Sequence, residues 1–197
     1  MSITCLEVVT LRLRPGVSDA EFLKQSALQR TEMAAVRGVL GRCLAKGDDG
    51  VWVDVVAWAG QADHDRAMEE LPSKPATAAW FALMDLESIN MHIGAADGGA
   101  FVAGGILELV LGKMQAGISA NMALEAVPAT TRILKQMQGY LSRVSATTAD
   151  GVFIDAVWWQ DHHCAVKAAA QFPTLPETQA FMRLFSTETR MFHLTPT

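Results

Sequence analysis

The sequence repeats itself once, without a gap, at an offset of 101 residues. Leu6-Glu7 recurs as Leu107-Glu108, and His92 recurs as His193. A period of this length is too long for a solenoid and fits a small domain. We therefore expect two copies of one folding unit, whose matching faces pack against each other as the subunits of a homodimer would.

Composition narrows the class of protein. Half of the 197 residues are hydrophobic and 19% are charged, which favours a full core over disorder. The net charge of −5 includes no basic block, so we expect no nucleic-acid partner. No apolar run has the length of a membrane span, so we expect no membrane partner either. Cys5, Cys43 and Cys164 do not recur between the copies and predict free thiols in a cytoplasmic protein.

Each copy predicts the order strand, helix, strand, strand, helix, strand. Ser18 predicts the start of the first helix, and the Asp-Gly pairs at 49–50 and 150–151 predict hairpin turns. The small residues of 95–105 predict a linker between a first repeat at 1–94 and a second repeat at 106–197. The expected strands are 4–12, 39–46, 51–58, 87–93, 140–147, 152–159 and 188–194, and the expected helices are 18–35, 62–71, 76–84, 162–172 and 177–185.

This order is the ferredoxin-like βαββαβ unit. The predicted fold class is therefore α+β: two such repeats packed sheet to sheet as a pseudo-dimeric α+β barrel. One chain would complete the barrel as a monomeric pseudo-dimer, and further homo-oligomerisation is left open. The element order, a third strand ending in Trp58 or Trp159, and a Pro-x-x-Pro segment in each copy resemble the dimeric α+β barrel superfamily. Within it, the resemblance is to antibiotic-biosynthesis-monooxygenase-like and EthD-like domains.

Strand alternation indicates where a site would lie. Glu7, Asp54 and His92 lie on strands that are neighbours in a ferredoxin-like sheet, so they could converge on one face. Two carboxylates in an apolar site push their pKa values apart, and a histidine could share the proton. The alternative is a structural His–carboxylate hydrogen bond. The candidate catalytic residues are Glu7, Asp54, His92, Glu108, Asp155 and His193, and the candidate ligand-binding residues are Trp58, Trp159, Asn90, Arg42 and Arg143.

The resemblance implies a pocket between the sheet and its helices. It also implies a polar residue four positions before a tryptophan, as in Asp54–Trp58 and Asp155–Trp159, where quinone-forming members carry an amide. Haem-degrading members place a histidine where Met68 and its counterpart stand, so we expect no haem and no other cofactor. His162, His163 and Cys164 are adjacent and lack the spacing of metal ligands, so we expect no metal site. The arginines at 42 and 143 could bind an anion or pair with the aspartates at 54 and 155.

The resemblance and these residues together imply a cofactor-independent, monooxygenase-like enzyme acting on a small apolar or aromatic molecule, by oxygenation or by acid–base chemistry of the isomerase type. The competing hypotheses are a non-enzymatic module that binds a hydrophobic ligand and a purely structural barrel. The two copies also differ. Pro128 lies within the first helix of the second copy, and Met191 replaces Asn90. We expect unequal pockets, with the first copy the more polar and the better candidate for chemistry.

Overall fold

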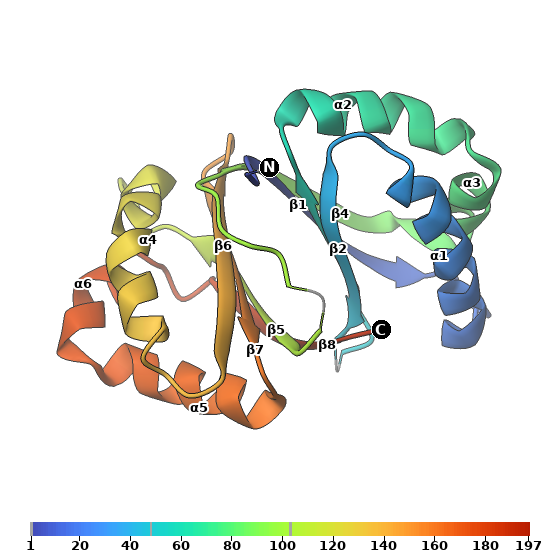
Figure 1. Cartoon of the computed structure of the whole chain (residues 1–197). Coiled ribbons are helices and arrows are strands. Elements are labelled where there is room, and N and C mark those ends of the chain that lie inside the picture. Colours follow the sequence, from blue (N-terminus) through green and yellow to red (C-terminus); the bar gives the residue numbers. More distant parts are fainter. Residues whose placement is uncertain (1, 48, 103) are drawn as a thin grey trace.

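A computed structural model describes residues 2–47, 49–102 and 104–197 of the chain. Two halves, each a curved sheet with helices on its outer side, face each other across a shared interior (Figure 1). The first half contains β1 (Cys5–Leu13), α1 (Asp19–Ala34), β2 (Val39–Lys46), β3 (Trp52–Trp58), α2 (Gln61–Glu70), α3 (Pro75–Phe81) and β4 (Met84–Ala96). The second contains β5 (Ile106–Lys113), α4 (Ala120–Leu134), β6 (Tyr140–Thr148), β7 (Val152–Trp159), α5 (His162–Gln171), α6 (Gln179–Met182) and β8 (Arg190–Pro196).

The strands form one closed antiparallel barrel in the order β1-β3-β2-β8-β5-β7-β6-β4. Each half therefore has the sheet order of a ferredoxin-like unit, with β1 between β3 and β4. The two sheets join at two seams, where β2 pairs with β8 and β4 pairs with β6. The predicted fold class, a pseudo-dimeric α+β barrel closed within one chain, is confirmed.

Alternation along the strands separates two apolar regions. Leu6 and Val8 of β1 point into the barrel, where they join Val53 and Val55 of β3 and their counterparts from the second half. The intervening side chains, Glu7 among them, point outward beneath the helices. Both faces of the central strands are thus covered, and every residue of β3 is buried. The space between sheet and helices is where a ligand site would lie.

Local sequence signals explain most element ends. Ser18 caps α1 by accepting a hydrogen bond from the backbone N–H of Glu21 at 3.2 Å. Gly50 turns the first hairpin at a φ of 76°, a conformation that favours glycine. Other ends differ from the prediction. β4 extends to Ala96, two residues beyond the boundary expected at 94, and α4 continues through Pro128 to Leu134. None of the helices in the described residues is long and apolar enough to cross a membrane.

The last strands of the two repeats pair with different registers. In the first half Val8 lies opposite His92, whereas in the second half Glu108 lies opposite His193. The offset of 101 would place His92 opposite Glu7, so β4 is displaced by one residue relative to β8. Residues 186–189 precede β8, whereas the corresponding residues of the first repeat lie within β4, at an irregularity where its register against β1 shifts between Asp85 and Asn90. Because side chains alternate along a strand, a displacement of one residue reverses the face on which each lies.

Candidate functional site

A cavity of about 350 Å³ lies between the sheet and the helices of the second repeat. Its floor carries Glu108 from β5, Asp155 and Trp159 from β7, and Arg143 from β6. Its lining also includes Ser186, Thr187 and Thr189, which precede β8, and Met191 of β8. Much of the remaining lining is apolar, and it includes the aromatic rings of Phe153, Phe172, Phe181 and Phe185. The size and the few polar groups are those of a small-molecule site.

The corresponding space in the first repeat is filled by aromatic rings. Phe22 of α1 lies 4.8 Å from Trp52 of β3 and 5.3 Å from Trp80 of α3, measured between ring centroids. Adding 101 to each number gives Ala123, Phe153 and Phe181, so every ring is smaller or absent in the second repeat. Met68 is likewise replaced by Ala169, which lines the cavity. The pockets are unequal, but in the opposite sense to our expectation, because the second repeat holds the cavity.

The conserved geometry of the two repeats includes a paired arginine and aspartate. In the first repeat Arg42 Nε and Nη2 each donate to the carboxylate of Asp54 at 2.9 Å, and in the second Arg143 Nε and Nη2 donate to Asp155 at 2.7 Å. Ser145 donates to the same Asp155 carboxylate at 2.8 Å. All four charged side chains are nearly buried. Both oxygens of each aspartate are thus occupied by a two-pronged arginine contact.

Glu108 has a different partner. Its Oε2 atom lies 2.9 Å from Nε2 of His193, and the two side chains are 9% and 20% exposed. The antiparallel pairing of β5 with β8 places these residues directly opposite each other. Glu108 is therefore a carboxylate that lines the cavity and forms a hydrogen bond with a histidine. The sequence prediction brought Glu108, Asp155, His193 and Trp159 to one face, and the structure places them there.

The equivalent carboxylate of the first repeat has other neighbours. Glu7 Oε2 accepts a hydrogen bond from Trp58 Nε1 at 3.0 Å and lies 3.8 Å from His64 Nε2. Burial raises the pKa of Glu7, and the nearby Asp54 carboxylate raises it further, against the opposing effect of His64. Sequence reasoning missed His64 as a neighbour of Glu7. Its position within α2 was the available signal, but only the packing of that helix over β1 brings the ring to the carboxylate.

Two predicted site residues of the first repeat lie elsewhere. His92 pairs with Val8 and Asn90 with Thr10, and these partners point toward the barrel interior instead of toward the helices. The prediction that His92 converges with Glu7 and Asp54, with Asn90 beside it, is therefore wrong. The physical reason is the one-residue displacement of β4. Burial lowers the pKa of His92, with the Asp150 carboxylate opposing the shift and Arg190 reinforcing it.

The two tryptophans that end the third strands also differ. Trp58 donates its Nε1–H to Glu7, but the matching oxygen of Glu108 is taken by His193. Trp159 Nε1 is buried and has no hydrogen-bond partner among the described residues. The Trp159 ring lines the cavity, packed edge-on against Tyr140 at 5.9 Å. The indole N–H groups of Trp52, Trp80 and Trp158 also lack an acceptor among the described residues, but of the four only Trp159 lines the cavity, where its N–H can donate to a ligand oxygen.

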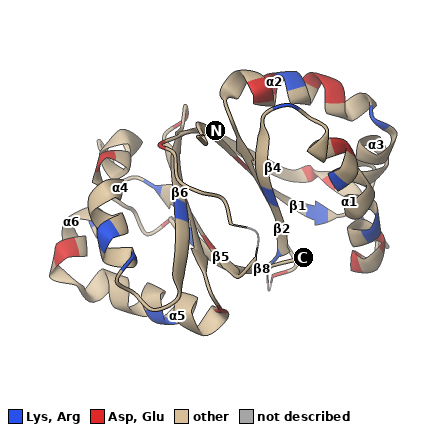
Figure 2. Cartoon of the chain, in the orientation of Figure 1, with Lys and Arg blue, Asp and Glu red and all other residues tan. Residues whose placement is uncertain are grey.

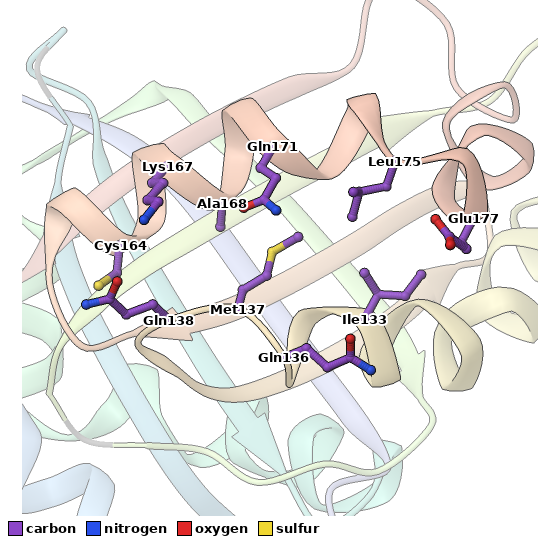
Figure 3. A pocket seen from close by; sticks show the side chains of 10 residues that line it. All are labelled: Ile133, Gln136, Met137, Gln138, Cys164, Lys167, Ala168, Gln171, Leu175 and Glu177. Carbon is purple, nitrogen blue, oxygen red and sulfur yellow. The ribbon is translucent and has the colours of Figure 1, made fainter.

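A second hollow, of about 410 Å³, lies outside the cavity between α5 and the end of α4. Figure 3 shows side chains from the two segments facing each other across it, with Lys167 and Gln171 on α5 opposite Gln136 and Met137. Ala168 lines both the hollow and the cavity. Figure 2 shows acidic and basic residues interspersed over the helices of both halves.

The described residues contain no group of three or more histidine, cysteine, aspartate or glutamate side chains placed to hold a metal ion. The adjacent residues His162, His163 and Cys164 diverge on α5, with both histidines exposed and the cysteine buried. Arg42 and Arg143, predicted either to bind an anion or to pair with aspartate, make the aspartate contacts described above.

The fold matches solved structures, although no protein-family model and no curated protein matches the sequence. A protein from Lactobacillus acidophilus NCFM, provisionally named a monooxygenase, superposes with a TM-score of 0.70 at 8% identity over 98% of this chain and 94% of that one. An anthrone oxidase-like protein gives 0.66 at 12% identity, covering 98% and 91%. A major regulator of staphylococcal pathogenesis gives 0.60 at 10% identity, covering 98% and 99%. These likenesses establish the dimeric α+β barrel fold across the whole chain, and the names attached to that fold span different functions.

Proposed function

We propose that the second repeat is the working half of a cofactor-independent, monooxygenase-like enzyme that acts on a small aromatic molecule. One observation carries the proposal: Glu108, bonded to His193, lines an aromatic cavity whose counterpart in the first repeat is filled. Acid–base groups contribute most when they stand beside a substrate in a site that excludes water. The names of two fold neighbours, one provisionally named a monooxygenase and one an anthrone oxidase-like protein, agree with this chemistry.

The cavity suits a flat, apolar substrate with an oxygen at one edge. Phenylalanine rings at 153, 172, 181 and 185 provide faces and edges for ring stacking. Trp159 supplies an unsatisfied N–H for a carbonyl or phenolate oxygen. The Arg143–Asp155 pair has no net charge, and further hydrogen bonds from neighbouring side chains hold it in place. We therefore assign it a structural role in the floor of the cavity, not a role in proton transfer.

The proposed reaction balances with molecular oxygen as the only co-substrate. Glu108 removes a proton from an activated CH₂ group beside a carbonyl, and the resulting carbanion is stabilised by the hydrogen bond from Trp159 to the substrate oxygen. The carbanion transfers one electron to O₂, and the two radicals combine as a hydroperoxide. Loss of water then leaves a ketone, so that R₂CH₂ and O₂ become R₂C=O and H₂O. The proton held by Glu108 is returned to the departing oxygen.

The test is oxygen consumption in the presence of an anthrone, with matched variants in the two repeats. Glu108→Gln should lower kcat by about 10²–10⁴-fold, the usual contribution of a general base. Glu7→Gln makes the same chemical change at the corresponding position of the first repeat and should leave kcat within about twofold of wild type, since a residue outside the active cavity makes no transition-state contact. Equal losses from both variants, or a loss from Glu7→Gln alone, would contradict the proposal.

A non-enzymatic binding module is the second candidate, and the pairing of both cavity carboxylates favours it. Asp155 is neutralised by Arg143 and Glu108 is bonded to His193, an arrangement that can also simply satisfy buried polar groups. A thermal-shift screen with quinones and anthrones separates the two candidates, because a ligand bound only to the native state raises Tm. A rise in Tm with no oxygen consumption or other turnover would favour the binding module.

We further propose that the protein works as a monomer in a reducing cytoplasm. One chain closes the barrel that two identical subunits would otherwise form, and the three thiols are free and buried. Burial raises the pKa of Cys5 to about 11 and that of Cys43 to about 12, which keeps both thiols protonated and unreactive. Light scattering coupled to size-exclusion chromatography should give the mass of one chain, 21.3 kDa.

A further inference from the structure

Three ionisable side chains lead from the cavity to the surface of the second repeat. Glu108 lines the cavity and is 9% exposed, and its Oε2 lies 2.9 Å from Nε2 of His193. The His193 ring, 20% exposed, meets the ring of His162 edge-on with centroids 5.8 Å apart. His162 lies in the first turn of α5 and is exposed to solvent. Exposure therefore increases step by step along the series.

We infer that His193 and His162 form a proton path between Glu108 and solvent. The inference deepens the proposed function, because it assigns the route by which the Glu108–His193 pair exchanges a proton with solvent while Glu108 holds the proton taken from the substrate. Imidazole suits this role, since one ring nitrogen can accept a proton while the other releases one. Nε2 of His193 faces Glu108, which leaves Nδ1 as the nitrogen that exchanges with His162, directly or through one water molecule.

The transfer balances with one proton entering and one leaving. With His193 as an imidazolium and Glu108 as a carboxylate, the pair has no net charge. A proton arriving on Glu108 removes the negative charge that held the imidazolium beside it. His193 then releases its Nδ1 proton to His162, and His162 passes a proton to water. The pair is again neutral. When Glu108 later gives its proton to the departing oxygen, a proton from water returns through His162 to His193 and restores the starting state.

The first repeat has no such series at the matching positions. Gln61 stands where His162 stands, and Ile93 instead of a histidine lies opposite Glu7. The second repeat also supplies an internal comparison. His163 is the next residue on α5 and is also exposed, but neighbouring helical residues point about 100° apart, and the ring that contacts His193 is that of His162. The path is therefore tied to one position on the helix.

The decisive experiment needs no substrate. Protein labelled with ¹⁵N in its histidines allows exchange of the His193 ring N–H proton with water to be followed by NMR. His162→Phe keeps an aromatic ring against His193 but removes the proton-carrying nitrogens, and His163→Phe is the matched control. We expect exchange at His193 to slow about tenfold in H162F, to stay at the wild-type rate in H163F, and to recover when free imidazole is added, since a relay contributes at least that much. Unchanged exchange in H162F would overturn the inference.

Turnover of an anthrone distinguishes failure of the path from failure of the proposed function. If both are right, H162F should lower kcat about tenfold or more, with rescue by free imidazole, while H163F stays at the wild-type rate. A loss in Glu108→Gln without any loss in H162F would overturn the path and leave the function standing. Slowed exchange in H162F, in a protein that turns over no anthrone, would support the path and reject the proposed oxygenation.

Discussion

Side-chain size at a few paired positions separates the two repeats. Phe22 and Met68 fill the first repeat, and alanines stand at both matching positions of the second. Trp52 and Trp80 of the first repeat are also replaced by the smaller rings of Phe153 and Phe181 in the second. A core tolerates such truncations poorly unless something occupies the space, because cavities cost stability in proportion to their volume. The open volume beside Trp159 therefore supports a ligand site more strongly than any single polar residue does.

Restoring the larger side chain in the second repeat should close its cavity. Ala169→Met introduces the residue that stands at the matching position of the first repeat, where it packs against Trp58 and its neighbours. We expect the affinity for an aromatic ligand to fall at least about tenfold, a loss of ~1.4 kcal/mol, with Tm unchanged or higher. Isothermal titration measures the first quantity and calorimetric unfolding the second.

The reciprocal variant Met68→Ala is the control for that experiment. It should lower Tm, because it opens space in a filled core, while leaving ligand affinity as in wild type. Weaker ligand binding in Met68→Ala than in Ala169→Met would place the ligand in the first repeat.

Glu7 should make stability depend on pH. Its folded pKa is raised above the ordinary value of 4.5, chiefly by burial. The stabilisation from holding its proton is therefore fully present below pH 4.5 and is lost as the pH rises through the folded pKa. Glu7→Gln keeps an acceptor for Trp58 and carries no charge, so its unfolding free energy at pH 8 should exceed that of wild type by about 1 kcal/mol, or ~2–4 °C in Tm.

The gain from Glu7→Gln should shrink toward pH 4.5, where Glu7 is protonated in the folded protein. Glu69→Gln, an exposed change on α2, should alter Tm little at either pH. A gain of the same size at both pH values would show that the carboxylate charge is not its cause.

The sequence predicted some residue contacts and missed others. The contacts of Arg42 with Asp54 and of Arg143 with Asp155 were among the predicted alternatives. In each repeat the two residues lie on adjacent strands of one hairpin, and the Asp-Gly turn sets the register of that hairpin. The sequence could not predict that the indole N–H of Trp58 donates a hydrogen bond to Glu7 while that of Trp159 donates to no described residue. That difference follows from which side chain lies opposite each glutamate, and this depends on the pairing of the last strand.

At the scale of elements, the last strands carry the difference between the repeats. The sequence predicted their order in each sheet, and the order is confirmed. It did not predict their register, because the residues before the last strand interrupt the pairing differently in the two repeats: an irregularity lies inside β4, and residues 186–189 precede β8. In the second arrangement Ser186, Thr187 and Thr189 line the cavity, and His193 lies opposite Glu108. One residue of register thus positions the acid–base pair.

His92 should report the register of β4 directly. Lying toward the barrel interior, it should titrate below the ordinary value of 6.5, because burial lowers its pKa. Asp150 faces it from the β6–β7 turn and Arg190 from β8, so Asp150→Asn should lower the pKa further and Arg190→Gln should raise it. The neutral form favours the fold above pH 6.5, and this contribution is lost as the pH falls through the folded pKa.

Titration of ¹⁵N-labelled histidines checks this placement. A pKa above 6.5 that falls on Glu7→Gln would instead put His92 beside Glu7, on the helix side of the sheet, as the offset of 101 alone would suggest.

At the scale of the whole molecule, the repeat predicted the architecture because two ferredoxin-like sheets have only a few ways to cover their open faces. Here they close through the β2–β8 and β4–β6 seams. Closure demands close approach at one point. A Cβ atom at Gly94 would lie 2.9 Å from Cβ of Ala146 and 3.0 Å from the carbonyl oxygen of Thr147 across the β4–β6 seam.

Gly94→Val should therefore strain the seam and lower the free energy of unfolding by about 1–3 kcal/mol, as overpacking of a core does. Gly60→Ala is the control, since its nearest neighbour would be Thr4 Oγ1 at 3.7 Å, an ordinary contact. Chemical denaturation measures both. An unchanged Gly94→Val would mean that the β4–β6 seam is looser than described.

The central claim is that one repeat binds the ligand while the other supports the barrel. A crystal structure of the chain soaked with an anthraquinone tests it most directly. We predict one molecule per chain, stacked among Phe153, Phe181 and Trp159 with an oxygen at the indole Nε1, and an unaltered Phe22–Trp52–Trp80 cluster in the first repeat. A ligand bound in the first repeat, or inside the barrel between the two sheets, would contradict the account.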